Sequence, residues 1–210
     1  MAKKCDNIYK DGEKIFFTSD QHFNHEHIIK FCNRPFKTCE EMNNVLIDKW
    51  NETVPPDGLV FHLGDFAWGG YQAWKNVRDK LNGKIILIKG NHDWKNGPQS
   101  EAQYDELFEF TTQQLYISIE DRKMFLNHFP LLCYSGTDRN EKDAVWALSG
   151  HTHVGPLSMT GKDTERLKIA FPTQYDIGVD MNDFKPISFH DVSERINYQV
   201  ANNVNMLHWI

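Results

Sequence analysis

Three short apolar runs that alternate with two amphipathic segments set the strongest limit on the fold. The runs are KIFFTSD at residues 14–20, LVFHLGDF at 59–66 and KIILIKG at 84–90. The segments between them, residues 40–54 and 71–83, repeat their apolar side chains at helical spacing, and Gly83 is expected to end the second helix. Strand, helix, strand, helix, strand is the order of βαβ units, which predicts a parallel sheet covered on both faces.

The second half of the chain is expected to be richer in strands. Four segments are strand-like and have shorter connections: 113–120, 123–129, 144–150 and 173–181. A late helix is predicted at 188–200, where Ser188 and Asp191 are placed as a capping box. The segment 157–173 has no clear pattern. We therefore predict one α/β domain over residues 1–210, built as two packed mixed β-sheets flanked by helices, an αββα sandwich.

Composition narrows the classes of partner. The chain of 210 residues is 40% hydrophobic and 25% charged, which is ordinary for a globular protein. Its net charge of -6 gives no basic footprint for duplex nucleic acid, which is not expected as a partner. No segment approaches the roughly 18 to 20 apolar residues that span a bilayer, and residues 1–14 lack the apolar stretch of a signal peptide. No membrane partner and a cytoplasmic location are therefore expected.

A short polar cluster follows each of several apolar runs. These clusters are SDQHFNH at 19–25, LGDF at 63–66, KGNHD at 89–93, LNHFP at 126–130 and SGHTHVGP at 149–156. In open α/β sheets, ligand sites lie beyond the carboxyl ends of the strands. We therefore expect side chains from five remote segments to meet in one cleft.

The residue types in these clusters indicate a metal centre. Carboxylate, imidazole and amide oxygen suit manganese, iron, zinc or nickel better than calcium or magnesium alone. The set is too large for one ion, but two ions roughly 3.5 to 4 Å apart would use all of it. In GHTH, an extended backbone would direct His151 and His153 to the same side, and Gly150 would let the chain approach closely. The candidate ligands are Asp20, His22, Asp65, Asn91, His128, His151 and His153.

The order of the motifs resembles that of the calcineurin-like metallophosphoesterases. Asp-x-His, Gly-Asp, Gly-Asn-His-Asp, a lone His and Gly-His-x-His occur in the family's order, and the length is similar to that of small single-domain members from bacteria and phages. The resemblance implies two-metal-dependent hydrolysis of a phosphomonoester or phosphodiester by a hydroxide between the metals. It implies two divalent transition-metal ions, manganese first among them. The acidic balance of the chain favours a small phosphorylated substrate such as a nucleotide.

The resemblance also assigns a role to each matching residue. Asp20, His22 and His153 would hold one metal, Asn91, His128 and His151 would hold the other, and Asp65 would bridge both. His92 would face the phosphate as a general acid or charge stabiliser, because the leaving alkoxide needs a proton and imidazole titrates near neutral pH. Asp93 would orient His92.

Substrate contacts are less constrained by the sequence. His25 is a candidate for contact with the substrate phosphate. Arg34 has the bidentate donor geometry that binds phosphate, although a surface salt bridge is the alternative. Trp68 is expected to line the cleft, where it could stack on a nucleobase. Asp180 and Asp183 are expected either to support a metal ligand or to form a turn.

Two other functions compete with hydrolysis of a small phosphoester. One is a metal-stabilised binding or scaffold protein of the same fold, against which the non-ligand imidazole of His92 argues. The other is a nuclease for single strands, which predicts strongly salt-dependent binding to oligonucleotides. The GDFAWGG segment lacks the Asp or Asn that many family members carry after Gly-Asp, which argues against a phosphoprotein substrate.

Overall fold

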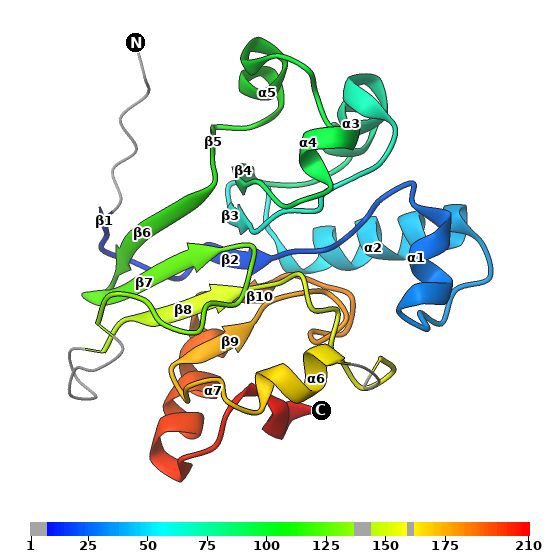
Figure 1. Ribbon diagram of the computed structural model, residues 1–210. Helices are drawn as coiled ribbons and strands as arrows, with labels where there is room; N and C mark the ends of the chain where they lie inside the picture. The colour runs from blue at the N-terminus through cyan, green and yellow to red at the C-terminus, as the bar shows by residue number, and fades with distance from the viewer. Residues whose placement is uncertain (1–7, 137–143, 159–161) are drawn as a thin grey trace.

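Two five-stranded sheets pack face to face in the computed structural model, which describes residues 8–136, 144–158 and 162–210 (Figure 1). The first sheet has the order β10 (Ile187–Ser188), β2 (Ile15–Thr18), β3 (Leu59–His62), β4 (Lys84–Ile88) and β5 (Phe110–Thr112). The second has the order β1 (Ile8–Tyr9), β6 (Gln114–Ile119), β7 (Arg122–Asn127), β8 (Trp146–Ser149) and β9 (Gln174–Asp176). The β10–β2 and β6–β7 pairs are antiparallel and the others parallel, so the predicted fold class of two mixed sheets with helices is confirmed.

Helices cover the sheets and form most of the longer connections between the strands. They are α1 (Glu26–Phe31), α2 (Cys39–Thr53), α3 (Gly70–Arg78), α4 (Asp93–Asn96), α5 (Glu101–Leu107), α6 (Lys162–Leu167), α7 (Phe189–Asn202) and the 3-10 helix η1 (Met206–Trp209). The late helix predicted from residue 188 is α7, and Ser188 Oγ accepts a hydrogen bond from Asp191 N at 3.1 Å. Within the ranges described, none of these helices has the length and apolar character needed to cross a membrane.

The parallel strands of the first sheet are buried on both faces because their side chains alternate between two apolar layers. Phe17, Phe61 and Ile86 point into the layer between the sheets, while Phe16 and Val60 point into the layer beneath helices α2 and α3. This explains why KIFF and KIILI are continuous apolar runs and not half-polar ones. The second sheet closes the inner layer with Leu115, Ile117, Met124, Leu126, Trp146 and Leu148.

The predicted end of helix α3 at Gly83 is wrong. The helix ends at Arg78, and residues 79–83 turn back toward strand β4. The Arg78 guanidinium donates to the carbonyl oxygens of Leu81, Gly83 and Leu107 and so holds this turn. Gly83 is still needed, because its φ of +82° lies in the left-handed region at the turn.

Helix α2 is anchored to the first sheet by Trp50, a side chain with no exposed surface. We expect Trp50→Ala to lower the free energy of unfolding by about 3–5 kcal/mol, because a large buried ring is lost and a cavity remains. The hydrogen bond from Trp50 Nε1 to Asn82 O is lost as well. Urea unfolding measures the change. Trp94→Ala is the matched control: this ring is 55% exposed, and a change above about 1 kcal/mol there would contradict the assignment of the core.

Candidate metal centre

All seven predicted metal ligands meet at the carboxyl ends of the strands. The loops after β2, β3, β4, β7 and β8 supply them. They form two groups, and within each the ligand atoms of the aspartates and histidines lie within 4.8 Å of one another. Asn91 joins the second group, because its Oδ1 is 3.0 Å from His128 Nε2. The first group is Asp20, His22 and His153, and the second is Asp65, His128 and His151.

The Asp65 carboxylate lies between the two groups. Its Oδ2 is 3.4 Å from His22 Nε2 in the first group and 3.5 Å from His128 Nε2 in the second. Its Oδ1 accepts a hydrogen bond from His92 N at 2.9 Å. One oxygen is therefore committed to the backbone of the β4 loop, and the other faces both histidines.

Several buried polar atoms of the centre lack a hydrogen-bond partner. Asp20 Oδ1, His22 Nε2 and Asp65 Oδ2 are buried and unpaired among the residues described. A buried polar atom without a partner is costly, and most such atoms in proteins are satisfied. These three are two carboxylate oxygens and an imidazole nitrogen, which are ligand atoms for a divalent transition metal. The residues present therefore fit a metal ion.

A second layer of hydrogen bonds fixes how the histidines are presented. His128 Nδ1 lies 2.7 Å from Leu63 O, and since a carbonyl only accepts, this nitrogen carries the proton and Nε2 is free to bind a metal. His153 Nδ1 lies 2.9 Å from Asp180 Oδ2, which has the same effect. Such partners set the tautomer and basicity of a ligand imidazole.

Five of the candidate ligands have an unusual backbone. Asp20, His22, Asp65, His151 and His153 all have φ between +51° and +73°. This left-handed region costs non-glycine residues of order 1–3 kcal/mol each and is concentrated at functional sites. The prediction that His151 and His153 lie on an extended segment is therefore wrong. Each imidazole is directed by a sharp turn and not by strand alternation.

Gly150 has the role that the sequence predicts. A Cβ at this position would lie 1.9 Å from Ser19 Oγ and 2.2 Å from Asp20 Oδ2. The glycine lets the β8 loop lie directly against the β2 loop, and His151 N then donates to Asp20 Oδ2 at 2.9 Å. This contact joins the two strand ends that carry four of the candidate ligands.

Arg34 does not face a phosphate. Its side chain has no exposed surface and forms a bidentate ion pair with Asp180, with both N–O distances 2.8 Å. Its remaining donors reach the carbonyl oxygens of Asp20 and Gln21. Both sequence-based alternatives for Arg34, phosphate contact and surface salt bridge, are wrong, because the guanidinium is committed inside the protein.

Asp180 is the partner of both Arg34 and His153. Burial alone would raise the pKa of Asp180, but the Arg34 guanidinium and the His153 N–H hold this pKa below its usual value. The carboxylate is therefore ionised and holds the imidazole of the candidate ligand His153. It follows strand β9, a sixth strand end in the same region.

Asp93 holds two loops together and does not contact the His92 ring. Its carboxylate accepts hydrogen bonds from the backbone N–H groups of Asp65, Phe66 and Gly90, at 2.7–2.9 Å. Burial raises the pKa of Asp93 to about 7, and the nearby Asp65 adds to this, while the three N–H donors oppose it. The expected orientation of His92 is thus indirect, through the loop that Asp93 fixes.

His92, His25 and Trp68 lie together beside the first ligand group. The His92 ring centroid is 5.2 Å from that of His22 and 5.1 Å from that of Trp68. His25 stacks on Trp68 at 4.0 Å. Burial, with His22 and His92 nearby, lowers the pKa of His25 to about 4, so its imidazole is neutral at pH 7.

The sequence reasoning missed Asp176, which is buried in the same region. Its carboxylate accepts from Thr152 Oγ1 at 2.6 Å and from Gly178 N at 2.7 Å, and it thereby supports the loop between His151 and His153. Burial raises the pKa of Asp176 to about 7. The sequence feature that could have indicated Asp176 is its place in DIGVD, a polar residue within the predicted strand segment 173–181.

Comparison with known proteins agrees with this arrangement. The family model described as calcineurin-like phosphoesterase matches residues 13–155, which include every candidate ligand. The chain belongs to the calcineurin-like phosphoesterases. Members of this family use divalent metals. Membership in the family therefore supports metal-dependent phosphoester hydrolysis as the general class of activity.

Relatives of this phosphoesterase chain have similar sizes. The uncharacterized protein MJ1445 of Methanocaldococcus jannaschii is 33% identical over 83% of this chain and 86% of its own. The gene 66 protein of Mycobacterium phage D29 is 24% identical over 78% of this chain and 90% of its own. A crystal structure of a protein of unknown function from Aquifex aeolicus has a TM-score of 0.63 at 22% identity, covering 86% of this chain and 97% of that one. The similarity to this last structure shows a shared fold alone.

The Arg34–Asp180–His153 chain predicts that Asp180→Asn weakens metal binding. The neutral amide cannot balance the buried guanidinium, and it holds the His153 N–H less strongly. We expect manganese affinity to fall about 10–100-fold, measured by calorimetry. Asp183→Asn is the matched control, because this nearby carboxylate is 73% exposed and forms its ion pair, among the residues described, with Lys49 and not with a candidate ligand. Equal affinities for the two variants would contradict a supporting role for Asp180.

Proposed function

We propose that this phosphoesterase-family chain hydrolyses a phosphomonoester or phosphodiester with the help of two divalent metal ions, in a single domain spanning residues 1–210. The observation that carries the proposal is the position of Asp65 Oδ2. This buried, unpaired oxygen lies at nearly equal distances from a histidine of each ligand group. A carboxylate in that position suits a bridge between two cations.

The ligands divide between the two positions as follows. Asp20, His22 and His153 hold the first ion, Asn91, His128 and His151 hold the second, and Asp65 is shared. The mixed set of imidazole nitrogens and carboxylate or amide oxygens favours a transition metal. Manganese, which accepts the oxygen ligands, is the first candidate, and iron, zinc or nickel are the alternatives. When bound, such ions supply hydroxide at neutral pH and withdraw charge from phosphate oxygens.

His92 would assist the leaving group. Its ring lies at the edge of the first ligand group, yet no ligand group includes it. Its backbone N–H is held by Asp65, so the imidazole is positioned by the same carboxylate that joins the two groups. A positioned imidazole can give a proton to the departing oxygen, a contribution worth 10²–10⁴-fold in rate.

The stacked pair of His25 and Trp68 lies beside the first ligand group, where we expect the substrate to contact it. His25 is neutral at pH 7 and is packed flat against Trp68, so we assign the pair to a wall of the substrate cleft and not to charge pairing with phosphate. A small phosphorylated molecule, a nucleotide among them, is the proposed substrate. The net charge of -6 accords with this choice and not with a duplex nucleic acid.

The metal assignment predicts that Asp65→Asn loses metal. The amide presents an N–H₂ group or a single oxygen where the proposal requires an oxygen shared by two cations. We expect the manganese content of purified protein to fall from two ions per chain to one or none, measured by elemental analysis. His190→Ala, an exposed side chain on helix α7, should keep both ions. Two tightly bound ions in Asp65→Asn would refute the bridging role.

The role of His92 predicts a different result. His92→Ala should keep both metals and lose about 10²–10⁴-fold in kcat, assayed with p-nitrophenyl phosphate and bis-p-nitrophenyl phosphate in manganese. A variant with unaltered turnover on the better ester would show that His92 is not the proton donor. Metal-loaded wild-type protein that hydrolyses no ester would instead favour a scaffold. Salt-dependent binding to oligonucleotides would favour a nuclease.

A further inference from the structure

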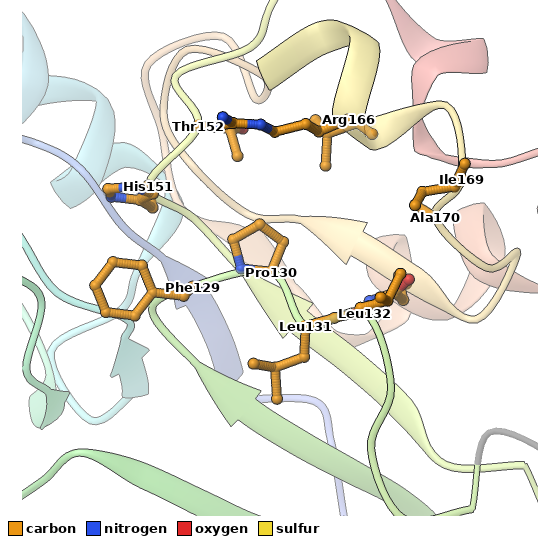
Figure 2. A pocket seen from close by; sticks show the side chains of 11 residues that line it. Phe129, Pro130, Leu131, Leu132, His151, Thr152, Arg166, Ile169 and Ala170 are labelled. Atoms are coloured by element: carbon orange, nitrogen blue, oxygen red, sulfur yellow. The ribbon is translucent and has the colours of Figure 1, made fainter. Parts of the chain in front are cut away.

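A pocket of about 350 Å³ opens directly beside the proposed metal centre. His151, a candidate ligand, and Thr152 form one end of it. Figure 2 shows Phe129 and His151 at this end and Ile169 and Ala170 at the opposite end. A molecule held through phosphorus near His151 would therefore have one of its ester groups at the mouth of this pocket.

The wall of the pocket is mainly apolar. It is formed by the segment after strand β7, by helix α6 and by the residues that follow α6 (Figure 2). The lining includes Phe129, Pro130, Leu131, Leu132, Ile169 and Ala170. Thr152, Arg166 and Gln174 add polar groups to this wall. Of the candidate metal ligands only His151 lines the pocket, so the pocket differs in chemistry from the centre it adjoins.

Three of the lining side chains expose much of their apolar surface. Leu132 is 70% exposed, Ile169 is 66% exposed and Phe129 is 44% exposed. The Phe129 ring also packs against the His151 ring, with centroids 4.6 Å apart. Exposed apolar side chains that gather around a concavity are typical of a ligand site, because a bound apolar group would remove them from water.

We propose that this pocket is a subsite for an apolar, ring-sized ester group of the substrate. The proposal deepens the proposed function and rests on it, because the phosphate of the same molecule would be held at the metal centre. The chemical class is a phosphoester whose organic group is aryl or bulky alkyl. A pocket of this volume is within the usual range for small-molecule sites, and burial of a ring against these side chains contributes binding free energy in proportion to the apolar area covered.

Direct binding of two phosphonates to manganese-loaded protein tests the subsite without requiring turnover. Methylphosphonate and phenylphosphonate present the same anion to the metals and differ in the apolar group. Calorimetry should give phenylphosphonate at least about tenfold tighter binding, which corresponds to about 1.4 kcal/mol. Ile169→Asp and Leu132→Asp, both at exposed positions, should each bring the ratio of the two affinities toward one.

Ile8→Asp is the matched control. It is the same substitution at a side chain that is 74% exposed on strand β1, outside the pocket, and it should keep the wild-type ratio. Equal affinities in the wild type, or a ratio that survives both pocket substitutions, would overturn the subsite and leave the hydrolytic function standing. If the pocket instead binds a partner protein, the two phosphonates would likewise bind with equal affinity, and the subsite proposal would be wrong. Failure of both phosphonates to bind the manganese-loaded protein would overturn the proposed function together with the subsite.

Discussion

The carboxylate of Asp65 is the group on which the geometry of the site depends. Its backbone N–H is held by Asp93, its Oδ1 holds the backbone of His92, and its Oδ2 faces His22 and His128. One short side chain thus joins the β3 and β4 loops and both ligand groups. The position of Asp65 depends in turn on the parallel pairing of β2, β3 and β4. This pairing brings the carboxyl ends of the three strands to one edge of the sheet.

This arrangement is unfavourable for the protein alone. Five candidate ligand residues occupy the left-handed region, and three of their polar side-chain atoms are buried with no hydrogen-bond partner in the part of the chain that the structure describes. The backbone strain and the unpaired atoms both raise the free energy of the folded protein. The apolar layers on either side of the first sheet stabilise the fold enough to offset them. Cations would offset them, because coordination satisfies the unpaired atoms and replaces repulsion between neighbouring donors. Metal binding and folding stability are therefore coupled in such a site.

The convergence of the candidate ligands could be predicted from the sequence, because each belongs to a short motif directly after a recognisable strand. Predictions failed where the determining contact is remote. Arg34 meets Asp180 across 146 positions of sequence, so nothing near Arg34 indicates that it is buried. The early end of α3 depends on an Arg78 contact to Leu107. The turn at His151 lies against the β2 loop, where Gly150 packs on Ser19, and strand periodicity cannot reveal this contact.

Two environments with opposite character meet at His151. On one side are the buried carboxylates and imidazoles, which suit cations and phosphate oxygens. On the other is the pocket beside α6, whose lining is mainly aliphatic and aromatic side chains. The polar side depends on strand ends, whose positions are fixed by the sheets. The apolar side depends on the connection after β7 and the residues that follow α6, which are not part of any strand. Loops vary more readily than the strands that support them. On the proposed assignments, the metal chemistry would therefore depend on the strand ends, and the choice of ester group would depend on the longer connections beside them.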